Sequence, residues 1–194
     1  MPKLRCLGTN LFLLCFALSV ATAQDTKPVA PIPAQYAATA VGQAGGAAGK
    51  TFGLTVYVEG LTSDGEVQEL LGILKQKGQN GVVSAMEDVK DKGRVAPTGN
   101  VGTGMRFVRI RPNKQGGFHI VLVTNRPITF GELYNSTRSR DYPFGIVVLE
   151  LDKDGKGTGT FAPACKIRFN KKSELEIEHY GQKPFRLANV YREK

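Results

Sequence analysis

The side chains best suited to proton transfer or nucleophilic attack are two histidines and one cysteine. His119 lies in the apolar run Phe118–Val123, and His179 follows the alternating segment Leu175–Glu178. If both imidazoles pointed into one cavity with Cys165 or an acid, they would form an acid–base or metal site. No catalytic signature spacing links them, so the alternative is that all three are buried strand residues. A histidine-based hydrolase is therefore one hypothesis.

Arginines supply a second kind of candidate site, for anions. Lys and Arg number 26 against 17 Asp and Glu. Arg138, Arg140 and Tyr142 lie close together in sequence and suit bidentate binding of an acidic group, with Arg109 and Arg111 as further candidates. The alternative is a solvated loop with a local Arg–Asp pair, because exposed charges are usually solvated. The basic excess supports a second hypothesis, a module that docks on an anionic polymer or a membrane surface.

Two motifs resemble ligand-binding loops but lack the context that such loops need. Asp152 and Asp154 resemble the start of a calcium loop, yet lysines sit among the acids and the later ligands are missing. A tight Asp-Gly turn explains the same residues. Residues 44–51 resemble a phosphate-binding loop, but Thr51 is expected to open a strand where that loop needs a helix. No metal or cofactor is predicted.

The N-terminal segment, residues 1–23, is typical of a signal peptide. It begins with Lys3 and Arg5, continues with an apolar run and ends in small residues. The run is short for a bilayer core, which needs about 20 apolar residues. We expect cleavage before Gln24, no transmembrane segment afterwards and a secreted or periplasmic product, which makes nucleic acid an unexpected partner. Removing 23 of the 194 residues leaves 171 and lowers the formal net charge from +9 to +7.

The segment that follows predicts a tether and then the first long strand. Residues 24–50 are dominated by Ala, Gly and Pro and suit a tether, with a short strand over 36–41 as an alternative. Residues 51–58 are rich in β-branched and aromatic residues and predict a strand. We expect a single domain over residues 51–194.

Two helices are expected after that strand. Ser63 and Glu66 have capping-box spacing, and apolar residues then recur at helical spacing until Gly78, which can end the helix. A second helix is expected over about 81–90, before Gly93. Two helices so close in sequence predict a helical hairpin that lies on an apolar sheet.

The remainder of the chain predicts strands. They are expected over 105–111, 118–124, 144–151, 158–161, 165–169, 174–178 and 185–191. Pro163 predicts an edge or a bulge. Because no helix alternates with these strands, a parallel sheet is disfavoured. We expect an α+β fold: a curved antiparallel sheet, or a partly closed β-barrel or sandwich, with the helical hairpin inserted after the first long strand.

Several stretches resemble a group of uncharacterised small secreted bacterial proteins. They are residues 62–70, 138–144, 152–157 and 175–178, together with 184–187. The resemblance covers most of the chain after about residue 36. It implies secretion and a single domain, and it carries no established activity and no catalytic residues.

The first functional hypothesis is a secreted or periplasmic module without catalytic activity, either structural or binding a small apolar ligand. No catalytic constellation is visible in the sequence, and a curved apolar sheet can enclose such a ligand. An interior filled by side chains would remove the ligand-binding form of this hypothesis, which has the ligand enclosed by the sheet. The basic docking module and the histidine-based hydrolase are the alternatives.

Overall fold

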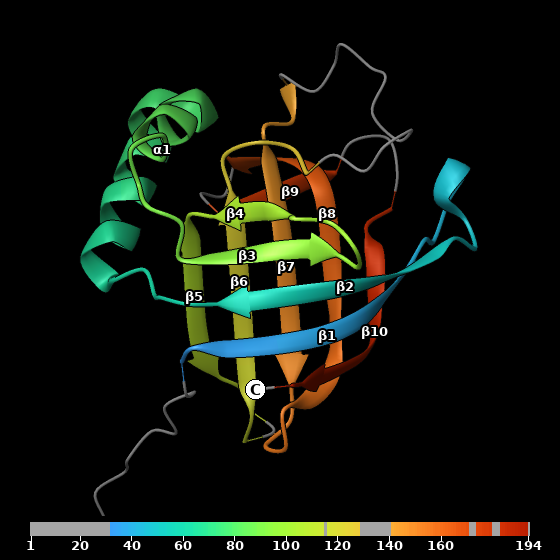
Figure 1. Cartoon of the computed structure of the whole chain (residues 1–194). Coiled ribbons are helices and arrows are strands. Elements are labelled where there is room, and N and C mark those ends of the chain that lie inside the picture. Colours follow the sequence, from blue (N-terminus) through green and yellow to red (C-terminus); the bar gives the residue numbers. More distant parts are fainter. Residues whose placement is uncertain (1–31, 115, 129–140, 171–173, 180–182, 194) are drawn as a thin grey trace, which may run out of the picture.

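The structure is a computed structural model that describes residues 32–114, 116–128, 141–170, 174–179 and 183–193. These residues form a ten-stranded antiparallel sheet that curls into a nearly closed barrel, with one α-helix at its side (Figure 1). The strands are β1 Ala34–Val41, β2 Thr51–Val58, β3 Gly93–Pro97, β4 Thr103–Met105, β5 Phe107–Pro112, β6 Phe118–Thr124, β7 Phe144–Leu151, β8 Lys156–Phe169, β9 Leu175–His179 and β10 Phe185–Arg192. Helix α1 spans Asp64–Ala85, and a short 3-10 turn, η1, spans Gly45–Ala47. The expected antiparallel, barrel-like sheet is confirmed.

The strand order shows how the barrel closes. Neighbouring strands follow β4-β3-β2-β1-β10-β8-β7-β6-β5, and β9 pairs with β8. In Figure 1, β1 to β3 cross the front while β6 to β8 run behind them at a steep angle. Met105 ends β4 and Phe107 begins β5, so the two end strands of this order follow each other in sequence. Between them Arg106 N donates to Val123 O (3.0 Å), which draws the two ends of the sheet together.

The barrel interior is a packed apolar core. Inward side chains alternate with half-exposed ones along β2, where Leu54, Val56 and Val58 are buried. Ile120 and Leu122 of β6 belong to the same buried cluster. This alternation is the period-two pattern of a strand with one face on a core. Side chains therefore fill the middle of the barrel, while a second pocket, bordered by Phe52, Ile128 and Phe185, opens beside the β3–β4 turn.

The predicted two-helix hairpin is not seen; the described residues hold one α-helix, α1. Its backbone leaves the helical region at Gly78 (φ 65°, ψ −166°) and then becomes helical again. The glycine that we expected to end the helix therefore kinks it, because glycine alone adopts this backbone conformation without strain. The second predicted helix, over 81–90, contributes only the last residues of α1, which ends at Ala85.

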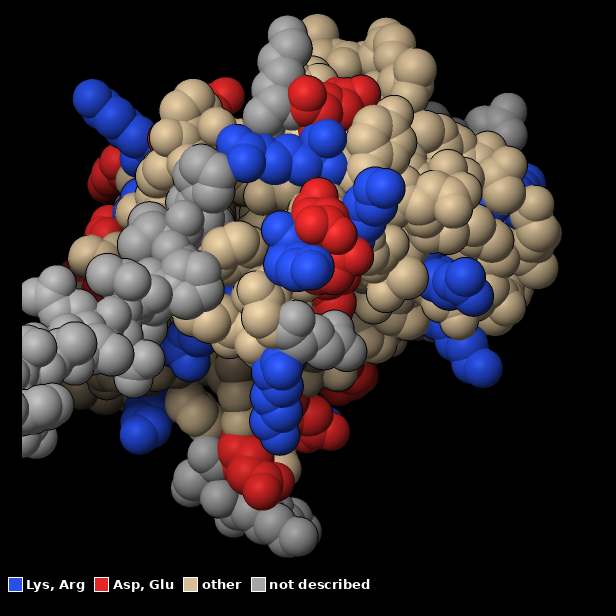
Figure 2. All heavy atoms as spheres, turned by 90° about the horizontal axis from the view of Figure 1, so that it is seen from below, with Lys and Arg blue, Asp and Glu red and all other residues tan. Residues whose placement is uncertain are grey.

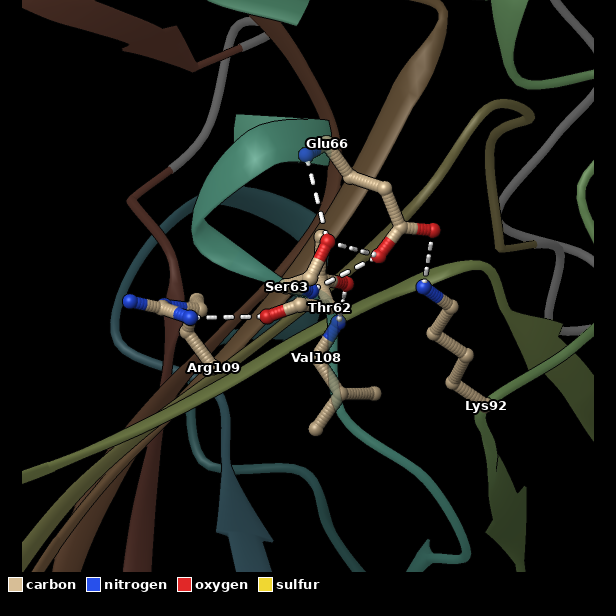
Figure 3. A network of polar contacts seen from close by, with 6 residues as sticks. All are labelled: Thr62, Ser63, Glu66, Lys92, Val108 and Arg109. Carbon is tan, nitrogen blue, oxygen red and sulfur yellow. Dashed lines mark hydrogen bonds and ion pairs between the residues drawn. The ribbon is translucent and has the colours of Figure 1, made fainter. Parts of the chain in front are cut away.

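The two ends of α1 are held against one short stretch of chain, from Arg106 to Arg109 at the start of β5. At its start, Thr62 N donates to Val108 O (2.8 Å), Val108 N donates to the Thr62 hydroxyl (3.0 Å), and Arg109 donates to Thr62 O (2.7 Å; Figure 3). At its end, the Arg106 guanidinium donates to the carbonyls of Met86 and Glu87. A straight helix of 22 residues would be about 33 Å long, whereas Arg106 and Arg109 lie about 10 Å apart along the chain. The kink in α1 is what allows both attachments.

The predicted capping box at the start of α1 is confirmed. The Ser63 hydroxyl accepts from Glu66 N (3.2 Å), and the Glu66 carboxylate accepts from Ser63 N (2.7 Å; Figure 3). Lys92, which precedes β3, donates to the same carboxylate (2.6 Å). The hydrogen bond from Lys92, followed by those from Ser63, lowers the pKa of Glu66 from 4.5 to about 2. The ion pair thus ties the helix start to the sheet.

This pKa predicts an acid-sensitive contribution to stability. Because the folded state lowers the pKa of Glu66 from 4.5 to about 2, the ionised carboxylate stabilises the fold above about pH 4.5, and that stabilisation is lost as pH falls toward 2. The Glu66→Gln variant keeps a capping residue but removes the charge, and we expect it to lose up to about 1 kcal/mol at neutral pH, since the side chain is partly exposed. Urea unfolding from pH 2 to 7 measures this, with Glu69→Gln on the exposed side of α1 as control. An equal loss at pH 2 and pH 7 would contradict the prediction.

The first strand lies where the sequence allowed a short strand over 36–41, within the predicted tether. Residues 34–41, which fall within the predicted tether, form the full-length strand β1. It pairs with β2 on one side and with β10, the last strand, on the other. Ala34, Tyr36, Ala38 and Ala40 are buried in the barrel core. The folded domain therefore includes residues that we expected to lie in the tether.

Two further predictions concern β8. Where the sequence suggested separate strands over 158–161 and 165–169, the structure has one continuous strand. The predicted bulge at Pro163 is present, because Phe144 pairs with Cys165 while Ile146 pairs with Ala162. One extra residue on β8 is thus inserted opposite β7, as in a β-bulge.

Candidate functional site

An apolar cleft of about 550 Å³ lies between α1 and the outer face of the sheet. The helix contributes the apolar stripe expected from its sequence, and apolar residues after the kink extend this stripe. These residues are Val67, Leu70, Leu71, Leu74, Val82 and Met86. The cleft is therefore outside the barrel, on the side opposite to the packed interior.

The floor of the cleft is built from three rows of residues across β5, β6 and β7. Residues directly opposite each other in antiparallel strands share one face of the sheet, and alternate residues along a strand return to that face. The first row is Phe107, Val123 and Ile146; the second is Arg109, Val121 and Val148; the third is Arg111 and His119, and Glu150, which pairs with His119, lies outside the lining of the cleft. The first two rows are apolar apart from Arg109, and the third is polar. The floor thus changes from apolar to polar along the strands.

The far side of the cleft is formed by the β8–β9 hairpin. Ile167 of β8 and Leu175 and Ile177 of β9 line it. Leu175 is 51% exposed and Ile177 is 41% exposed. Neighbouring large apolar side chains left open to water lose the stabilisation that burial would give. The cleft is open on this side, and a ligand there would cover both residues.

The polar end of the cleft carries three bases. Arg109 donates to Thr62 O (2.7 Å) and forms an ion pair with Asp64 at the start of α1. His119 is hydrogen-bonded through Nδ1 to the Glu150 carboxylate. Arg111 is exposed and has no ion pair or side-chain hydrogen bond within the described part of the chain. Arg111 is thus the cation at this end whose charge is not already matched.

The structure does not bring the two histidines together. His119 is on β6 and His179 is on β9, with β7 and β8 between them. They also lie at different heights, because His119 pairs with Glu150 near the end of β7, whereas His179 is opposite Cys165, which pairs with Phe144 at the start of β7. No acid–base pair of histidines is formed. The hydrolase hypothesis has only the His119–Glu150 contact to support it.

Cys165 has the environment of a structural residue. It is fully buried, and its thiol donates to Phe144 O (3.4 Å). Burial raises the pKa of this thiol to about 12. A nucleophilic cysteine needs a thiolate at working pH, so this environment opposes that role. Partial desolvation lowers the pKa of His179, although this residue is exposed at the end of β9.

The other candidate residues are in separate places. Arg138 and Arg140 lie outside the described residues. The Tyr142 hydroxyl donates to the Glu178 carboxylate (2.7 Å), and Lys166 Nζ lies 4.3 Å from the Tyr142 ring centroid. This tyrosine is therefore engaged in contacts between β9 and the segment before β7.

Asp152 and Asp154 form the turn between β7 and β8. The Asp152 carboxylate accepts from Asp154 N and Lys156 N, both at 2.9 Å. Gly155, at φ 74°, closes the turn and donates to Asp152 O (3.1 Å). The carboxylate oxygen used in this way caps backbone N–H groups, as in an Asx turn. Among the described residues, no three His, Cys, Asp or Glu side chains are grouped closely enough to hold a metal ion.

Sequence reasoning did not identify the cleft, although one signal was available. The run from Ile120 to Val123 is apolar without alternation, and so is the first part of β7. A strand that is apolar on both faces is covered on both faces. The floor residues Val121 and Val148 belong to these runs. This pattern indicated a second layer over β6 and β7, but not that a space remains beneath it.

Basic and acidic side chains are mixed on the face shown in Figure 2. Several arginines and lysines are paired with acids, among them Arg106 with Asp91 (3.6 Å) and Arg168 with Glu176 (3.2 Å). Pairing of this kind reduces the attraction of a surface for a distant polyanion. Docking on an anionic surface stays a prediction, and this face does not add to it.

The chain matches no family model, no curated protein and no solved structure in the comparisons with known proteins. Within the described residues, no helix combines the length and the apolar character required to cross a membrane. The functional argument therefore depends on the geometry of the cleft.

Proposed function

We propose that this protein is a binding module, without catalytic activity, for a small apolar ligand held between α1 and the outer face of β5 to β9. The observation that supports this is the apolar cleft of about 550 Å³ beside a barrel whose interior is filled. Small-molecule sites usually have volumes of about 300–1,000 Å³ and mostly apolar walls. The site differs from the enclosed site that a barrel suggests, because the ligand is outside the sheet.

Burial of apolar surface supplies the driving force. Leu175 and Ile177 are exposed in the structure, and Leu71, Val121 and Val148 are only partly buried. Each Å² of apolar surface removed from water contributes about 25 cal/mol. A ligand that covers these side chains gains binding free energy without displacing the core.

The test fills the cleft and measures binding of the neutral apolar probe N-phenyl-1-naphthylamine by fluorescence. Val121→Phe and Val148→Phe place extra volume on the cleft floor, and we expect each to weaken probe binding at least tenfold. Val101→Phe is the matched control, because Val101 is 84% exposed and lies at another site, beside the β3–β4 turn.

Thermal unfolding of each variant shows whether it is folded. If folded cleft-filling variants bind the probe as tightly as the parent and the control, the ligand does not occupy this cleft. Native mass spectrometry of protein purified from its own host provides an independent readout, since a bound natural ligand would appear as a defined added mass.

A further inference from the structure

We infer that the ligand is amphipathic: an extended apolar chain that ends in a single carboxylate, with the carboxylate bound at Arg111 and His119. This inference rests on the proposed function and adds the chemistry and the orientation of the ligand.

The first argument is the sign of the charges that face the cleft. Among its described lining residues, all are apolar except Arg109, Arg111 and His119, and no acid lines it. Arg109 and Arg111 are alternate residues of β5, and His119 is directly opposite Arg111 on β6. The three bases therefore gather at one end of an apolar surface, which is complementary to a chain with an anionic end.

The second argument concerns which base is available. Arg109 already contacts Asp64 and Thr62 at the start of α1, so its role is to position the helix over the cleft. Arg111 has no such partner in the described part of the chain. A guanidinium binds a carboxylate through two parallel hydrogen bonds, which are stronger than hydrogen bonds between neutral groups. Arg111 is thus the residue that would recognise the head group.

His119 is placed to assist Arg111. The Cβ atoms of directly opposite residues in an antiparallel pair lie about 4.5–5.5 Å apart, so both side chains can reach one carboxylate. The Nδ1 atom of His119 is hydrogen-bonded to the carboxylate of Glu150, which does not line the cleft. This contact fixes the ring, and Nε2 donates to the ligand carboxylate when the imidazole carries both protons, so Arg111 supplies the permanent charge of the site.

The surroundings favour a singly charged head over a phosphate. Asp64 and Glu150 lie next to the three bases and repel a doubly charged group. Glu66 N at the start of α1 is already bonded to Ser63, so it is not free to bind a phosphate. One unmatched arginine and one histidine therefore suit a carboxylate.

The shape of the cleft fits an extended chain. The polar row of the floor and the most distant apolar row are four residues apart along a strand, as from Arg111 to Phe107 on β5. Four residues of a strand span about 13 Å. The cleft then continues past Ile146 and Phe144 to Ile167 and Ile177. An extended chain with its carboxylate at Arg111 would lie along this path.

The test compares dodecanoate with dodecanol as competitors of N-phenyl-1-naphthylamine, both below their aggregation concentrations. We expect the parent to bind dodecanoate at least tenfold more tightly than dodecanol. Arg111→Gln should abolish this preference by weakening the binding of dodecanoate. Arg186→Gln, an exposed arginine on β10 away from the cleft, is the matched control and should keep the preference.

The outcomes separate this inference from the proposed function. If dodecanol and dodecanoate displace the probe equally from the parent, the head-group assignment is overturned and apolar binding stands. A preference that survives in Arg111→Gln overturns the role of Arg111, and tighter binding of dodecyl phosphate overturns the choice of carboxylate. If the probe and both competitors fail to bind the folded parent, the proposed function itself is wrong.

Discussion

Replacing Phe161 with alanine should lower the free energy of unfolding by about 3–5 kcal/mol, the usual cost of removing a large buried aromatic side chain. Phe161 is fully buried inside the barrel, and its ring lies 5.8 Å from that of Phe185, centroid to centroid. The truncation leaves a cavity in a core that β7, β8 and β10 hold rigidly. Urea-induced unfolding followed by circular dichroism measures the change.

Phe107→Ala is the matched control, because Phe107 is only half-buried and lines the cleft outside the barrel. We expect its stability cost to be clearly smaller, while the affinity for the apolar probe changes. Equal costs for the two substitutions would mean that the cleft is packed like the core, and would contradict the division between a filled barrel and an open binding site.

Gly78→Ala should destabilise the protein by about 1–3 kcal/mol, because its φ of 65° and ψ of −166° belong to a region that other residues enter only with strain. The kink also brings the two parts of α1 together. A Cβ added at Gly81 would lie 2.5 Å from Lys77 Cβ and 3.0 Å from Ile73 Cγ2. The absence of a side chain at Gly81 therefore lets the backbone after the kink lie close to these two residues before it. Straightening α1 would remove one of its attachments to β5 and deform the roof of the cleft. We therefore expect probe affinity to fall together with stability.

Gly72→Ala on the same helix is the control. A Cβ at Gly72 meets no atom within 4 Å, and the backbone there is helical. Alanine at such a position should stabilise the protein by about 0.5–1 kcal/mol and leave probe binding unchanged. If Gly78→Ala is as stable as Gly72→Ala, the kink is not required by the fold.

Features set by neighbouring residues could be predicted from the sequence. The capping box depends on Ser63 and Glu66, three residues apart, and the turn after β7 depends on Asp152 and Gly155. The bounds of β6 and β7 agree with the expected segments, because their apolar runs end at glycine, proline or polar residues. In each case the interacting groups lie within a few residues of one another.

Features set by distant residues could not be predicted. β1 has an alanine-rich sequence with weak strand propensity, and it becomes a strand because β2 and β10 pair with it on both sides. The helical hairpin was a wrong prediction for a similar reason. Gly78 is able either to end a helix or to kink one. The attachments of both helix ends to the short stretch from Arg106 to Arg109 decide between these outcomes.

The amino-acid order alone indicated most of the strands, though not β3 and β4, as well as where the helix begins and which face of it is apolar. Tertiary structure decided that the barrel fills its own centre, that the apolar face of α1 covers β5 to β9 incompletely, and that Arg111 and His119 share one end of the space left between them. The physical reason is that a side-chain pattern specifies which faces avoid water, whereas the space left between two such faces depends on how the whole chain closes around them.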